Sequence, residues 1–153
     1  MTVDEETQKL EIWDTAGQER FKSLAPMYYK GCKAAILVFD ITSETSFDKM
    51  RYWVDDLKNH LDKAPDVAVV VVVGNKKDLE SERVVSSDKA EKYVGELSTD
   101  LGRTVIYREC SAKTGGGVRE LFEDICRNVI PNDNCVEPPK TTSRHSHHGP
   151  PVR

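Results

Sequence analysis

The sequence VAVVVVVGNKKD at residues 67–78 decides the fold. The run before Gly74 is apolar at every position and mostly β-branched, which favours an extended strand with both faces buried. Strands of this kind are typical of parallel sheets that are covered by helices. The change to polar residues after Gly74 predicts a loop at the carboxyl end of the strand, where open α/β sheets bind their ligands.

Strand-like and helix-like segments alternate on both sides of this run. Gln8–Trp13 alternates apolar and polar residues, Ala34–Phe39 is apolar throughout and ends at Asp40, and Val105 and Ile106 mark a strand that ends near Cys110. The order predicts one α/β domain, with a mostly parallel sheet and helices on both faces. Helices are expected at Leu24–Lys30, at Ser46–His60, from Ser86 or Ser87 to Leu97, and at Val118–Ile130.

The composition excludes several classes of protein. The chain has 153 residues and a formal net charge of −4, which gives no electrostatic reason to expect a nucleic-acid partner. Its apolar runs are shorter than the ~18 residues of a membrane span, and its acidic start is not a secretory signal. The cysteines are far apart, as expected for reduced thiols in a cytoplasmic protein: Cys32, Cys110, Cys126 and Cys135.

The C-terminal end has a different composition. Residues 132–153 are polar and rich in proline, so we expect a disordered tail after a domain at residues 1–131. Three histidines in this tail could bind a metal ion, although histidines in such a segment are more often simply solvated: His145, His147 and His148.

The first polar loop follows the Gln8–Trp13 segment. Asp14 could hold a water bound to Mg²⁺, and Gly17 would let a backbone N–H approach a phosphate oxygen. Gln18 could orient a water for in-line attack. Taken alone, these residues are better explained by an ordinary turn.

The second polar loop is the end of the deciding stretch. The carboxylate of Asp78 could accept hydrogen bonds from the N1–H and the exocyclic amine of guanine, a donor pair that adenine does not offer. Asn75 could reach the purine ring and tie loops together, and the stem of Lys76 could lie over the base. A polar turn at a strand end explains this loop alone equally well.

The third polar loop, Ser111-Ala112-Lys113, follows the last predicted strand. The N–H of Ala112 could donate to the guanine carbonyl, and the stem of Lys113 could cover the second face of the base. As a lone tripeptide the loop carries no information. Its value is that all three loops are predicted at one edge of one sheet.

Together the three loops resemble the third, fourth and fifth motifs of Ras-superfamily GTPases. Further segments resemble the Rab family: Trp13–Phe21, Tyr28–Gly31 and Leu37–Thr42, with Leu24–Tyr29 similar to its early-endosomal branch. The resemblance covers residues 3–130. It implies a P-loop NTPase-type G domain that binds GTP or GDP with Mg²⁺ and acts as a switch in vesicle trafficking.

The resemblance also implies a role for each motif residue. Asp14 would serve Mg²⁺, Gly17 the γ-phosphate, and Gln18 the attacking water. Effectors, exchange factors and activating proteins would bind the second switch, residues 18–29. The guanine base would be bound by Asn75, Lys76, Asp78, Ser111, Ala112 and Lys113.

The sequence departs from the family pattern in two places. None of its nine glycines is followed by lysine, so the phosphate-binding loop, the first (central) strand, the first helix and the first switch are not in this chain. The last residues hold no prenylation motif, and the nearest cysteine is Cys135, so membrane anchoring is not implied. An endosomal or vesicle membrane is expected only if another feature anchors the chain.

These departures lead to two hypotheses. In the first, the chain is a truncated Rab-type GTPase whose nucleotide binding and hydrolysis are impaired. In the alternative, it is a non-enzymatic module that binds effectors or regulators through the retained second switch. We also expect either an unfilled gap beside Ala34–Asp40 or direct pairing of that strand with Gln8–Trp13. An unrelated α/β protein is the remaining possibility.

Overall fold

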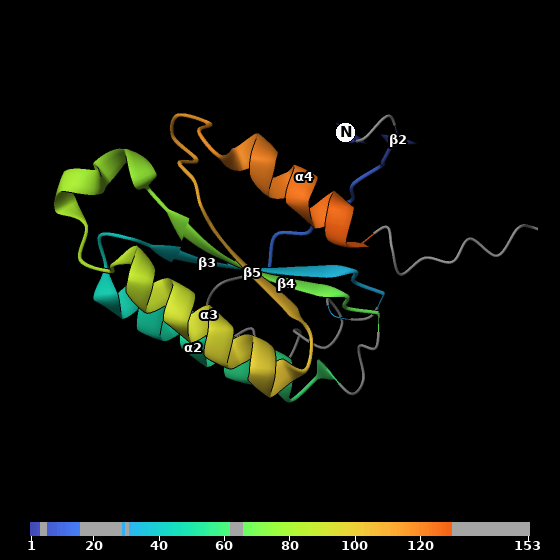
Figure 1. Cartoon of the computed structure of the whole chain (residues 1–153), viewed down its shortest axis with the longest axis horizontal. Helices are drawn as coiled ribbons and strands as arrows, with labels where there is room; N and C mark the ends of the chain where they lie inside the picture. The colour runs from blue at the N-terminus through green and yellow to red at the C-terminus, as the bar shows by residue number, and fades with distance from the viewer. Residues whose placement is uncertain (4–5, 16–28, 30, 62–65, 130–153) are drawn as a thin grey trace, which may run out of the picture.

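The computed structural model describes residues 1–3, 6–15, 29, 31–61 and 66–129. Its helices lie on both sides of a short parallel sheet (Figure 1). In chain order the elements are β1 (Thr2–Val3), β2 (Glu6–Thr7), β3 (Ala34–Asp40), α2 (Glu44–Lys58), β4 (Val69–Asn75), the 3₁₀ helix η3 (Lys77–Glu82), α3 (Ser87–Leu101), β5 (Thr104–Glu109) and α4 (Val118–Val129).

The sheet has the order β3-β4-β5, and both pairs are parallel. Asp40 is opposite Asn75 in the register, and Gly74 is opposite Glu109, so the three strands end close together. β4 lies in the centre and is buried from Val69 to Gly74, as its unbroken apolar sequence predicts. The predicted parallel α/β fold is confirmed.

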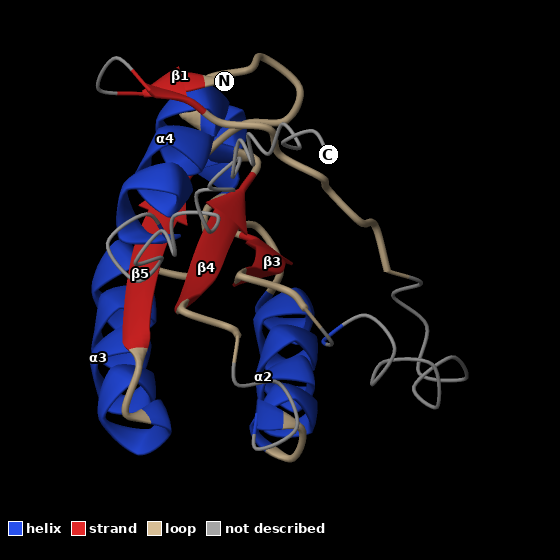
Figure 2. Cartoon of the chain, turned by 90° about the vertical axis from the view of Figure 1, so that its right-hand side faces the viewer, coloured by secondary structure: helices blue, strands red, loops and turns tan. Residues whose placement is uncertain are grey.

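Alternate side chains of β4 pack on opposite faces of the sheet. Val69, Val71 and Val73 lie in a cluster with Leu121 and Ile125 of α4. Val72 belongs to the cluster formed with α2 and α3, and Val70 packs with Leu57 of α2. Figure 2 shows the same layers, with α4 on one face of the sheet and α2 and α3 on the other. Two-sided burial thus follows from the period-two alternation of a strand.

The helix boundaries follow local capping chemistry. The side chain of Ser43 accepts a hydrogen bond from the N–H of Ser46 at the start of α2, and Ser86 accepts one from Lys89 at the start of α3. Gly102 ends α3 in the left-handed conformation. The predicted cap at Ser86 is confirmed, although the helix runs further than the expected end at Leu97. The expected helix at Leu24–Lys30 lies outside the described residues except for Tyr29.

The predicted strand at Gln8–Trp13 is wrong. The N-terminal pairing is instead a two-residue antiparallel hairpin of β1 and β2, extended by hydrogen bonds between Met1 and Gln8. Ile12 and Trp13 are 68% and 74% exposed. An amphipathic strand needs a neighbouring strand for its backbone groups, and residues 9–15 have none in the described part of the chain.

The outer edge of β3 is also unpaired in the described part of the chain. Among the described residues β3 pairs only with β4, and Val38 is 54% exposed. Gln8–Trp13 does not pair directly with β3, so among the described residues this edge is unfilled, which was one of the two expectations. In the described part of the chain, no helix is long and apolar enough to cross a membrane.

Candidate guanine-binding site

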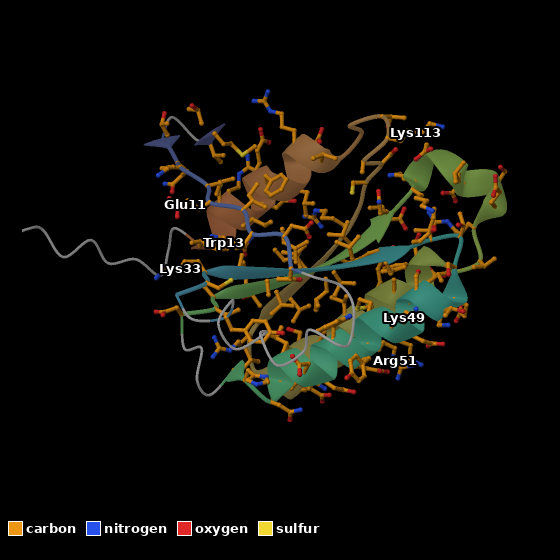
Figure 3. All side chains as sticks on the ribbon, turned by 180° about the vertical axis from the view of Figure 1, so that it is seen from behind. Glu11, Trp13, Lys33, Lys49, Arg51 and Lys113 are labelled. Atoms are coloured by element: carbon orange, nitrogen blue, oxygen red, sulfur yellow. The ribbon has the colours of Figure 1, made fainter. Side chains whose placement is uncertain are left out.

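The loops that follow β4 and β5 meet at the carboxyl end of the sheet. Their residues line an open pocket of about 380 Å³. Figure 3 shows Lys113 at this end of the sheet, opposite the end marked by Lys33. The pocket is lined by Asn75, Lys76, Asp78, Leu79, Ala112 and Lys113, so it brings together residues of the second and third predicted loops.

Hydrogen bonds lock the two loops together. The hydroxyl of Ser111 donates to Asp78 Oδ1 at 2.5 Å, and the N–H of Ala112 donates to Asn75 Oδ1 at 3.0 Å. The N–H of Lys77 also donates to the carbonyl of Cys110. The hydrogen bond from Ser111 holds the pKa of Asp78 below its usual range, with smaller help from the charge of Lys113. Asp78 is therefore an anionic acceptor at neutral pH.

Lys76 has an unusual backbone in this loop. Its φ of 68° puts it in the left-handed region, and it is the one non-glycine residue with positive φ among those described. Its ammonium lies 2.6 Å from Asp40 Oδ2 at the end of β3. This hydrogen bond raises the pKa of Lys76, which stays charged.

Gly117 supports the third loop by the absence of a side chain. A Cβ atom there would lie 2.6 Å from the carbonyl oxygen of Glu109, and the φ of Gly117 is +75°. The loop can therefore fold back toward the end of β5, where the N–H of Ser111 donates to Gly116.

A charged network lies behind the two loops. The guanidinium of Arg83 donates to both carboxylate oxygens of Glu109, at 2.8 and 2.9 Å, and to both oxygens of Glu80. Ser87 and Tyr107 also donate to Glu109. Desolvation raises the pKa of Glu109, but these hydrogen bonds outweigh it and lower the pKa to about 2. The network ties the end of η3, the start of α3 and the end of β5.

The residues of the first predicted loop are placed differently. Asp14 is exposed and is not among the residues that line the pocket. Trp13, its neighbour, is seen toward the Lys33 end of the sheet (Figure 3). Gly17 and Gln18 lie outside the described residues. The described part of the chain holds no group of three acidic, histidine or cysteine side chains that could bind a metal ion.

Comparison with known proteins identifies the family. A sequence model described as the Ras family matches residues 1–131. The chain belongs to the Ras family. Among curated Ras-type relatives, the Dictyostelium discoideum "Putative ras-related protein Rab-5B" is 44% identical over 132 residues, covering 86% of this chain and 58% of the relative. The Saccharomyces cerevisiae "GTP-binding protein YPT52" is 44% identical over 137 residues, covering 76% of this chain and 55% of the relative.

A plant relative gives the same picture. "Ras-related protein RABF2a" of Arabidopsis thaliana is 44% identical over 129 residues, covering 84% of this chain and 60% of the relative. This Ras-family chain thus spans somewhat more than half the length of the curated relatives it matches. The Rab resemblance drawn from the motifs is confirmed, and the name Rab-5B agrees with the branch suggested by Leu24–Tyr29.

The donor set of this Ras-family chain fits a guanine base better than a metal ion. Asp78 offers a charged carboxylate beside lysine stems, as the edge and faces of guanine require. Asp14 is a single exposed carboxylate, which does not by itself bind Mg²⁺ firmly. The described residues therefore do not form a Mg²⁺ site.

Sequence reasoning missed three residues that shape the site. Leu79 lines the pocket, Asp40 pairs with Lys76, and Glu109 anchors the network behind the loops. One signal was present for Asp40, because it ends an apolar strand at the same edge of the sheet. Glu109 ends β5 at the same edge, but its partner Arg83 is distant in the sequence, so their pairing could not be inferred.

Proposed function

We propose that this chain binds guanine nucleotides as a Rab-type switch protein of vesicle trafficking, in its endosomal branch. The observation that carries the proposal is the pocket in which two sequence-separated loops bring together Asn75, Lys76, Asp78, Ala112 and Lys113. Asp78 would accept hydrogen bonds from the two N–H groups at the guanine edge. The hydrogen bond that Asp78 accepts from the Ser111 hydroxyl would hold its carboxylate in place. The stems of Lys76 and Lys113 would cover the faces of the base.

The affinity of this chain for a guanine nucleotide should come from contacts with the base and the ribose. The sequence has no Gly-Lys pair, so the lysine that usually holds the β- and γ-phosphates is not supplied by these residues. Guanosine has about 20 non-hydrogen atoms, and ~0.3 kcal/mol per atom gives about 6 kcal/mol, or a Kd no tighter than about 10–100 μM. We also propose that Gln18 alone supports no GTP hydrolysis above background.

Calorimetric titration with guanosine, inosine and adenosine tests the proposal. Guanosine should bind at least about tenfold more tightly than adenosine, and inosine should be intermediate because it lacks the exocyclic amine. Asp78→Asn should abolish the preference for guanosine over inosine, whereas Asp88→Asn on the exposed side of α3 should preserve it. Equal binding of the three nucleosides by the unaltered chain would refute the proposed function.

A second candidate function is supported by the exposure of Ile12 and Trp13, at 68% and 74%. Apolar side chains this exposed, next to the second switch, suit a module that binds effectors or regulators without cycling nucleotide. A pull-down with family-type effectors, with and without GTP, separates the two functions. Capture that is indifferent to GTP favours the module, and capture that requires GTP favours the switch.

A further inference from the structure

The end of β3 holds a carboxylate that none of the predicted loops includes. Asp40 is the last residue of β3 and lies opposite Asn75 in the register. Its Oδ2 atom is 2.6 Å from the ammonium of Lys76, which lines the pocket. The Asp40 side chain is only 20% exposed, whereas that of Lys76 is 50% exposed, so the carboxylate is the fixed partner of the pair.

The surroundings of Asp40 orient its carboxylate before Lys76 reaches it. The N–H and the hydroxyl of Thr42 both donate to Asp40 Oδ1, at 2.8 and 2.7 Å. The backbone N–H of Asp40 donates to the hydroxyl of Ser46 at 2.9 Å. Desolvation raises the pKa of Asp40, but the hydrogen bonds from Lys76 and Thr42 outweigh it and lower the pKa. An anion in a defined direction is thus available at the pocket wall.

Lys76 has a side chain that is mobile unless its ammonium is held. Its left-handed backbone is disfavoured for a residue with a Cβ atom, and its four-carbon stem has many rotamers. A charged hydrogen bond at the tip of the stem restricts these rotamers. The stem can then form a fixed wall of the pocket in place of a mobile one.

We infer that Asp40 is a positioning residue for guanine binding: it anchors the Lys76 ammonium so that the Lys76 stem is held against the base. The inference rests on the proposed function of the pocket, which it deepens. Asp40 would not touch the nucleoside. Its effect on binding would pass through Lys76 alone, and this makes the role separable from a general contribution to folding.

A double-mutant cycle on guanosine affinity tests this role. Asp40→Asn keeps an acceptor for Thr42 and removes the charge, while Lys76→Met keeps a stem and removes the ammonium. Asp40→Asn should weaken guanosine binding about three- to tenfold in the unaltered chain and less than about 1.5-fold in the Lys76→Met background. Asp48→Asn, the same change at an exposed position of α2, should leave the affinity unchanged.

A milder variant keeps the test decisive if Asp40→Asn fails to fold, as judged by circular dichroism. Thr42→Val removes one donor to Asp40 and should cause a smaller loss of affinity, which Lys76→Met should again abolish. Equal losses in both backgrounds would overturn the role of Asp40 while the proposed function stands. If the unaltered chain binds guanosine no more tightly than adenosine, both the proposed function and this role of Asp40 are overturned.

Discussion

The carboxylate of Glu109 shows how much one residue contributes to this site. It lies at the end of β5, is 12% exposed, and accepts hydrogen bonds from Arg83, Ser87 and Tyr107. Its pKa of about 2 lies below that of an unfolded glutamate, about 4.3. The paired carboxylate therefore stabilises the fold fully above about pH 4.3, and this contribution is lost as the pH falls toward 2.

Glu109→Gln should lower the free energy of unfolding by about 1–3 kcal/mol at pH 7. The difference from the unaltered chain should shrink as the pH is lowered from 5 toward 2.5, because the unfolded glutamate takes up a proton in this range while the folded Glu109 is still largely ionised. Urea unfolding followed by circular dichroism measures both effects. Glu96→Gln, at an exposed position of α3, is the matched control, and equal losses in the two variants would contradict the account.

At the scale of the elements, two glycines should respond in opposite ways to the same substitution. Gly117 has a φ of +75°, and its Cβ would meet the carbonyl of Glu109, so Gly117→Ala should cost about 1–3 kcal/mol and disturb the loop that holds Ser111. Gly95 lies inside α3 with nothing within 4 Å of its Cβ position, so Gly95→Ala should stabilise the helix by up to about 1 kcal/mol. Thermal unfolding measures both changes. A destabilising Gly95→Ala or a neutral Gly117→Ala would refute this reading.

The same scale shows what the sequence could predict. β3 and β4 were predictable because short, continuous apolar runs indicate strands with both faces buried. The start of α3 was predictable because a serine cap directly precedes it in the sequence. The pocket was predictable because polar loops at the ends of parallel strands meet at one edge. The structure of Gln8–Trp13 was not predictable, since alternation of apolar and polar residues specifies a strand only if a neighbouring strand supplies hydrogen bonds. The Arg83–Glu109 ion pair was not predictable either, because it joins residues far apart in the sequence.

For the whole molecule, the outer edge of β3 is the surface most prone to association between copies. Its pairing groups face no other described strand, and an apolar edge of this kind promotes association between copies. We expect light scattering to show concentration-dependent association that Val38→Lys reduces, because a charge on an edge strand opposes pairing. Val84→Lys is the control: Val84 is similarly exposed, at 58% against 54% for Val38, but lies outside the sheet. Equal effects of the two substitutions would count against edge pairing.

The central claim is that the loops after β4 and β5 form one guanine-binding pocket. Backbone chemical shifts recorded during a guanosine titration test it most directly. The account predicts that guanosine shifts the amides of Asn75–Leu79 and Ser111–Lys113 together, with one common dissociation constant, and that adenosine at the same concentration does not. Shifts confined to only one of the two loops, or the same shifts with adenosine, would contradict it.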